Sequence, residues 1–256
     1  MRLNLTLILA AFLASFPSGE RTRAPQVAVV LKKFESTYRS SKALRANFLE
    51  QYFDNGKLVR SEAGVAYFSK PGKMRWEYAS PEPSLYLVDG KWSWFYVPAD
   101  HTVTRVRARQ SADTRTPLAL LAGEMKVSRI CKGVDLDSSS KPLNPTGVVL
   151  RCMLRGSEEP VAPQSGQSRA SAAVAQDAYA LFELNPENGE LLRVRVVNPG
   201  GVQVEFQFSS WQFDPPLEAS KFHFQPSRGV AIVDGDLGSA PDASIRKAQR
   251  YRYRNP

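Results

Sequence analysis

Apolar and polar residues alternate along much of this chain, and this period of two predicts a fold built mainly from β-strands. The clearest stretch runs from Val65 to Pro98 and reads as three short strands joined by turns. One of these strands alternates strictly, and its apolar face carries Met74, Trp76 and Tyr78. Asp89-Gly90 then marks a two-residue hairpin. Because aromatic residues occupy both faces of this meander, we expect something apolar to cover the second face.

The same pattern, followed along the chain, predicts about ten antiparallel strands. Besides the meander, strands are expected at Leu44–Phe53, Leu58–Phe68 and His101–Arg109, twice within Val127–Leu154, at Tyr179–Leu184, Leu191–Val197 and Val202–Phe213, and finally near Phe222, Phe224 and Val230–Val233. No linker separates two cores, so this order favours one large curved sheet.

Two helices are expected to interrupt the strands. Apolar residues spaced by three and four, among them Phe34, predict an amphipathic helix over Pro25–Lys42. A short second helix is expected over Thr116–Gly123, with Thr at the cap, Pro in the first turn and Gly at the stop. This helix is apolar nearly all round and contains Leu118, Leu120 and Leu121. A helix of this kind must be buried or must cover an apolar space.

The first residues resemble an export signal. A short basic start precedes an uncharged run from Leu3 to Phe16, which is too short to span a bilayer but typical of a secretory signal. A buried N-terminal core helix is the alternative, and cleavage is expected between Ser15 and Ala24. We therefore expect a signal peptide at 1–20, one domain at 25–235 with a low-complexity loop at 155–177, and a basic flexible tail at 236–256.

Charge and reactive residues narrow the function further. The net charge of +9 gathers around residues 105–115 and in the tail, which fits anionic lipid, nucleic acid or plain solubility. Cys131 and Cys152 are the only cysteines, and export favours a structural disulfide over two free thiols. His101 and His223 lie remote from them, which makes a poor metal set. The chain lacks P-loop, GxGxxG, GxSxG and HExxH motifs, so we expect no enzyme, cofactor or metal.

Several short segments follow one another in a fixed order along the chain. Each segment alone is common, but the ordered set is fairly specific. They are Ala46-Asn47-Phe48 ahead of Gln51, Gly64–Pro71 leading into Arg75–Tyr78, Pro81, Leu87–Gly90, Trp94–Tyr96, Thr116-Pro117, and Lys221–Pro226. Together, from about residue 27 to 233, they resemble the periplasmic outer-membrane lipoprotein carrier family, the LolA type.

This resemblance implies a mainly β fold: one unclosed, strongly curved antiparallel sheet or half-barrel, with short helices as a lid over an apolar cavity. It implies a periplasmic carrier without catalysis or cofactor, which takes acylated lipoproteins from an ATP-driven inner-membrane release complex to an outer-membrane receptor. We expect a monomer that binds no nucleic acid. The acyl cavity would be lined by Phe34, Phe48, Met74, Trp76, Tyr78, Leu118, Leu120 and Leu121. Ordinary core packing explains each of these residues equally well, because a closable cavity and a core need the same side chains.

The chain departs from the family pattern at one position that matters for the lid. Many family members carry an arginine before the turn proline, where it bonds to the lid, whereas this chain has Lys70. A lysine offers a point charge instead of a planar fork, so we expect Lys70 to gate the lid differently. Two other functions stay open: a periplasmic lipid- or protein-binding sensor or chaperone on the same sheet, and a basic module that binds anionic lipid.

Overall fold

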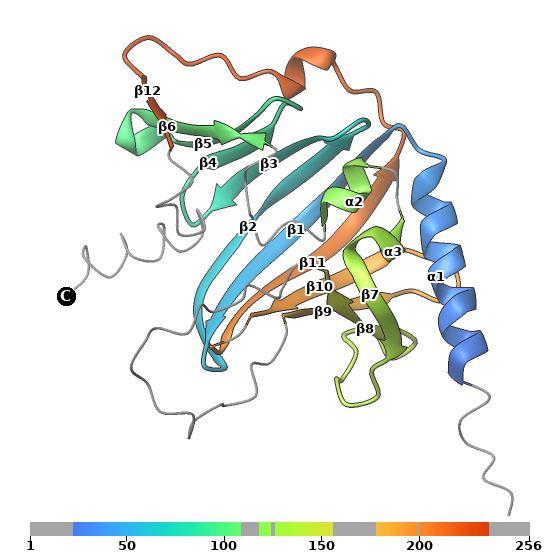
Figure 1. Cartoon of the computed structure of the whole chain (residues 1–256). Coiled ribbons are helices and arrows are strands. Elements are labelled where there is room, and N and C mark those ends of the chain that lie inside the picture. The colour runs from blue at the N-terminus through green and yellow to red at the C-terminus, as the bar shows by residue number, and fades with distance from the viewer. Residues whose placement is uncertain (1–22, 109–117, 124–125, 156–177, 199, 236–256) are drawn as a thin grey trace, which may run out of the picture.

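A computed structural model describes residues 23–108, 118–123, 126–155, 178–198 and 200–235 of the chain. Its centre is a single sheet of twelve strands in the order β12-β6-β5-β4-β3-β2-β1-β11-β10-β9-β8-β7. The sheet curves and does not close, because β12 and β7 form separate edges (Figure 1). The expected unclosed, curved, mainly β fold is therefore confirmed.

The strands are β1 (Ala43–Asp54), β2 (Lys57–Ser69), β3 (Lys73–Ser80), β4 (Ser84–Val88), β5 (Trp92–Val97), β6 (Thr102–Arg107), β7 (Cys131–Leu136), β8 (Val148–Leu154), β9 (Tyr179–Leu184), β10 (Leu191–Val197), β11 (Val202–Phe213) and β12 (Ala231–Asp234). The helices are α1 (Arg23–Arg39), α2 (Ala119–Ala122) and α3 (Val127–Ile130), with short 3₁₀ turns η1 (Pro98–Asp100) and η5 (Ala219–Phe222). None of the described helices has the length and apolarity needed to cross a membrane.

Two antiparallel meanders make up the sheet. Strands β1 to β6 form one and β7 to β11 the other, and β1 joins them by pairing with β11. The short β12 then pairs with β6 in parallel, so the expectation of a wholly antiparallel sheet is wrong at this edge. After β11 the chain crosses back over the molecule and places β12 beside β6 (Figure 1).

The inner face of the sheet is the face that meets the helices. Alternate residues of the strands point to it, as the period of two predicts, and they form one buried cluster with α1, α2 and α3. Within β1 the inner positions are Leu44, Ala46, Phe48, Glu50 and Tyr52, all buried. This cluster is the main core, and the three helices cover it.

Two local predictions are wrong, and others lie partly or wholly outside the described residues. Val127–Ile130 is a helical turn, not a strand, and strand structure begins only at Cys131. Phe222 closes the 3₁₀ turn η5, and Phe224 lies outside any strand. The start of the second predicted helix, Thr116-Pro117, lies outside the described residues, while its end at Gly123 agrees with α2. The predicted signal peptide, the 156–177 part of the low-complexity loop and the tail also lie outside them.

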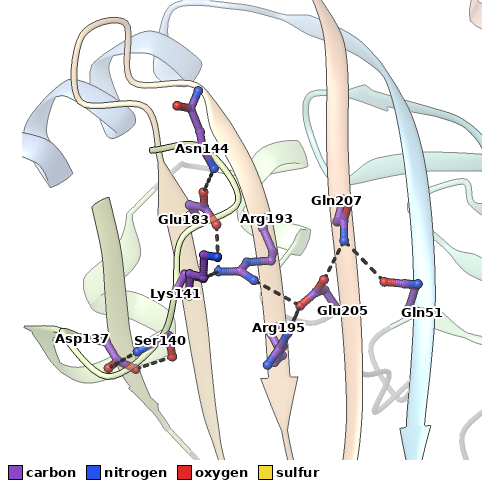
Figure 2. A network of polar contacts seen from close by, with 10 residues as sticks. All are labelled: Gln51, Asp137, Ser140, Lys141, Asn144, Glu183, Arg193, Arg195, Glu205 and Gln207. Atoms are coloured by element: carbon purple, nitrogen blue, oxygen red, sulfur yellow. Dashed lines mark hydrogen bonds and ion pairs between the residues drawn. The ribbon is translucent and has the colours of Figure 1, made fainter. Parts of the chain in front are cut away.

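The outer face of β9–β11 carries a buried polar network, drawn in Figure 2. The Arg193 guanidinium lies 2.8 Å from the Glu183 carboxylate and 3.6 Å from the Glu205 carboxylate, and it donates to the Lys141 carbonyl at 3.0 Å. The Asn144 N–H donates to Glu183 at 2.9 Å. These bonds hold the 137–147 loop against the sheet, and pairing is what makes such buried charges tolerable.

Candidate functional site

All eight predicted cavity residues lie together on the inner side of the sheet. Phe48, Met74, Trp76 and Tyr78 come from β1 and β3, and the others come from the covering helices and the residue that precedes α2: Phe34, Leu118, Leu120 and Leu121. Each is buried, with Trp76 and Phe34 at 0% exposure and Leu121 at 1%. The strands thus supply one wall of an apolar layer and the helices the other.

Trp76 is the centre of the aromatic side of this layer. Its ring centroid lies 4.9 Å from that of Phe48, 5.6 Å from Phe68 and 5.4 Å from Phe206. Edge-to-face packing of this kind adds to the burial of the rings. Within the described residues, the buried Trp76 indole N–H has no hydrogen-bond partner. An apolar layer with one unused donor could accept a ligand that brings an acceptor oxygen.

Helix α1 is tied to its surroundings by two side-chain contacts that the sequence did not indicate. The buried Tyr38 hydroxyl accepts a hydrogen bond from the Leu191 N–H at 2.9 Å, and burial raises the pKa of this phenol. Glu35 accepts from the Val127 N–H at 2.9 Å, which satisfies the first amide of α3. Helix α1 is therefore connected to both β10 and α3.

The turn between β2 and β3 contacts two of the three covering helices, α1 and α2. The Lys70 ammonium donates to the Tyr38 carbonyl at 2.7 Å and to the Arg39 carbonyl at 3.1 Å, at the end of α1. Cations are favourable at this end of a helix dipole. Two residues later, the Gly72 N–H donates to the Ala122 carbonyl of α2 at 2.7 Å. Burial lowers the pKa of Lys70, the nearby Arg39 charge lowers it further, and Asp214 opposes both.

The inner face becomes polar toward one end of β1. Glu50 is buried there and accepts a hydrogen bond from the Tyr78 hydroxyl at 2.5 Å. Beside it on β2, Glu62 pairs with Arg60 at 3.1 Å. The apolar layer thus has a polar boundary inside the fold, which limits how far an apolar chain could extend along the strands.

Cys131 and Cys152 form a disulfide in the structure. It joins the start of β7 to β8, next to the short α3 that packs against α1. The bond therefore secures the edge of the sheet on which the α1 cover rests.

Comparisons with known proteins find sequence similarity to lipoprotein carriers. Residues 39–141 match the family model described as outer membrane lipoprotein carrier protein LolA. An outer-membrane lipoprotein carrier protein of Chromobacterium violaceum is 29% identical over 83% of this chain and 91% of its own length. One from Xanthomonas campestris pv. campestris is 27% identical over 79% of this chain and 87% of its own length.

A solved LolA superfamily protein of Nitrosomonas europaea aligns with a TM-score of 0.38 at 10% identity, covering 77% of this chain and 97% of that one. The family model and the two curated relatives confirm the predicted resemblance to LolA-type lipoprotein carriers.

Proposed function

From this family resemblance, we propose that the protein is a periplasmic carrier that shields the acyl chains of lipoproteins on the inner face of its sheet. The observation that carries the proposal is the continuous apolar layer between the strands and the three covering helices. It is large, and short helices form one of its walls. A wall of this kind can move while the sheet stays intact.

The energetics fit a carrier. Each methylene removed from water contributes about 0.8 kcal/mol, so an acylated lipoprotein does not leave a membrane without a host for its chains. In the closed form, Phe34, Leu118 and Leu121 occupy the inner face themselves. Acyl chains would replace these side chains, so the cover competes with the cargo and binding stays reversible.

Lys70 is proposed to gate the cover. Its two bonds and the Gly72–Ala122 bond are polar contacts at one turn, and they must break if α1 and α2 separate from β3. An ATP-driven release complex in the inner membrane would load the carrier, and an outer-membrane receptor would unload it. These two steps would give transport its direction. In this scheme the protein carries lipoproteins from the inner to the outer membrane.

The decisive experiment is release of newly made, acylated lipoprotein from spheroplasts by the purified protein. We expect an acyl-dependent soluble complex with the wild-type protein, and at least tenfold less release with Leu121→Asp, because a charge on the inner face excludes acyl chains. The matched control is Leu143→Asp, since Leu143 is 49% exposed in the 137–147 loop.

Thermal unfolding of both variants separates lost binding from lost folding. Trp76→Phe keeps the aromatic packing but removes the indole N–H, and it tests the inner face without adding charge. Equal release by wild type and a folded Leu121→Asp would contradict the proposal. Failure of the wild-type protein to release lipoprotein while binding another periplasmic protein tightly would replace it with the sensor or chaperone role.

A further inference from the structure

The outer face of the first meander carries a second apolar cluster, separate from the inner layer. The segment after β11 folds back over this face, and Phe222 of η5 is buried there against Tyr67, Leu87, Trp94 and Val103. The stacked rings of Trp94 and Phe224, 5.2 Å apart, extend this cluster. The segment is thereby fixed over the sheet at Phe222 and Phe224.

Next to this contact the segment leaves a cavity of about 1110 Å³. Its floor is formed by side chains of β11 and of β1 to β5, and its other wall by residues 215–221 and 223–225. Ligand pockets in proteins commonly enclose about 300–1,000 Å³. We call this space the outer groove. It lies on the face of the sheet opposite to the proposed acyl site.

Cations are concentrated at one end of the outer groove. Gln212, Arg45, Tyr67 and Arg75 are directly paired neighbours on β11, β1, β2 and β3, so they form one row across the floor. From the opposite wall, the Lys221 ammonium lies 4.0 Å from the centre of the Tyr67 ring. Lys221 thus makes a cation–π contact with Tyr67, while Arg45 and Arg75 occupy the positions paired with Tyr67 on the two neighbouring strands.

Carboxylates do not balance these cations. Glu77 binds Arg75 at 2.6 Å and Lys221 at 3.4 Å, and although burial opposes its ionisation, these two cations lower its pKa. Glu218 also lines the groove but is exposed. Within the described part of the chain, Arg45 has no ion pair and no side-chain hydrogen bond. A positive excess in a partly enclosed space attracts anions.

The other end of the outer groove is apolar. Leu85, Tyr96 and Phe224 line it, and the Tyr96 and Phe224 rings lie 5.6 Å apart. We propose that the outer groove is a second binding site, for a small amphipathic anion whose charged head lies between Arg45 and Lys221 and whose apolar body lies along Leu85, Tyr96 and Phe224. This site does not depend on the proposed carrier function.

The test uses two fluorescent probes that differ in one charge. 8-Anilinonaphthalene-1-sulfonate carries a sulfonate on an aromatic body, and N-phenyl-1-naphthylamine is nearly the same body without it. We expect the sulfonate to bind the full protein one to one. Arg45→Gln and Lys221→Gln should each lower its affinity about tenfold, since bonds to charged groups are among the stronger ones. The uncharged probe should bind both variants as it binds the wild type.

The control is Arg107→Gln, because Arg107 stacks on Trp92 at 4.1 Å on the same half of the sheet but outside the groove. It should leave sulfonate binding unchanged. Octanoate and octyl phosphate, added as competitors, then distinguish a carboxylate head from a phosphate head. Arg45 and Lys221 are only partly buried, and an unchanged unfolding midpoint establishes that their variants fold.

Two results would overturn the proposal. One is sulfonate binding that survives both Arg45→Gln and Lys221→Gln. The other is sulfonate binding that is abolished by Leu121→Asp, which would place the probe on the inner face. Neither result would contradict lipoprotein release, which is measured in a separate assay, so the two proposals fail separately.

Discussion

At the scale of one residue, Lys70 shows how a lysine, a residue type common on surfaces, can hold a helix in place. Its ammonium reaches two carbonyls at the end of α1, which lack partners inside the helix. A lysine gives these contacts without the planar fork of an arginine, so both bonds converge on one atom. The contact to α1 therefore depends on a single nitrogen.

Replacing that nitrogen should loosen α1. We expect Lys70→Met, which keeps the apolar stem, to lower the free energy of unfolding by about 1–2 kcal/mol, because two bonds to a charged donor are lost. Amide exchange in α1 should become faster, measured by mass spectrometry. The control is Lys73→Met, at the first residue of β3 beside this turn. It should change neither the free energy of unfolding nor the amide exchange of α1. Equal effects of the two variants would show that the turn, and not the α1 contact, carries the stability.

Asp137 makes a second prediction at this scale. Burial opposes its ionisation, but hydrogen bonds from Ser139 and Ser140 outweigh this and lower its pKa to about 2. A carboxyl group with a lowered pKa stabilises the folded state when the pH is above the pKa that the group has in the unfolded chain, which is near 4. This stabilisation is lost as the pH falls through the pKa of the folded state.

Asp137→Asn should therefore cost about 1–2 kcal/mol of unfolding free energy at pH 6, and less than half of that at pH 2.5. Urea unfolding at both values measures the difference. A cost that does not change with pH would mean that the shape of the 137–147 loop matters and the charge does not.

At the scale of the elements, the strands and the short helix α2 were predictable from local patterns, whereas the short helix α3 was not. The inner positions of β1 and β3 follow from alternation alone, because a strand places every second side chain on one face. Helix α3 has four residues, two of which, Val127 and Ile130, are β-branched, and its first amide depends on Glu35, which lies far away in the sequence. No local pattern contains that partner, so the sequence indicated a strand instead.

Gly64 gives a prediction about how β2 and β3 fit together. A methyl group at this position would lie 1.9 Å from the Glu77 carbonyl oxygen and 3.0 Å from the Phe48 ring. We expect Gly64→Ala to destabilise the protein by about 2–4 kcal/mol, because the strand backbone itself must shift.

Gly133→Ala in β7 is the matched control, since nothing lies within 4 Å of the added carbon. It should change the unfolding free energy by less than about 0.5 kcal/mol. Chemical denaturation of both variants decides the matter, and equal stability of the two would show that the β2–β3 backbones can separate without cost.

At the scale of the whole molecule, part of the apolar layer could be predicted from the sequence, whereas the outer groove could not. Eight residues of the layer could be predicted to lie on the apolar side, because apolar residues recur with the period of a strand or a helix in each local segment. Arg45, Arg75 and Lys221 stand in different segments and are neighbours only through strand register and the return of the chain after β11. The polar network of Figure 2 was not foreseen for the same reason.

The pairing of β1 with β11 also affects how the chain can fold. These strands meet at the middle of the sheet, yet residues 43–54 and 202–213 are separated by most of the chain. Each meander has mainly local contacts and can form early, whereas the central pair must wait until the last quarter of the chain has been synthesised. Contacts between such distant segments slow folding, because a long loop must close first. A growing chain therefore keeps one edge of β1 available for pairing until β11 has been synthesised, and the two halves of the sheet can join only late in synthesis.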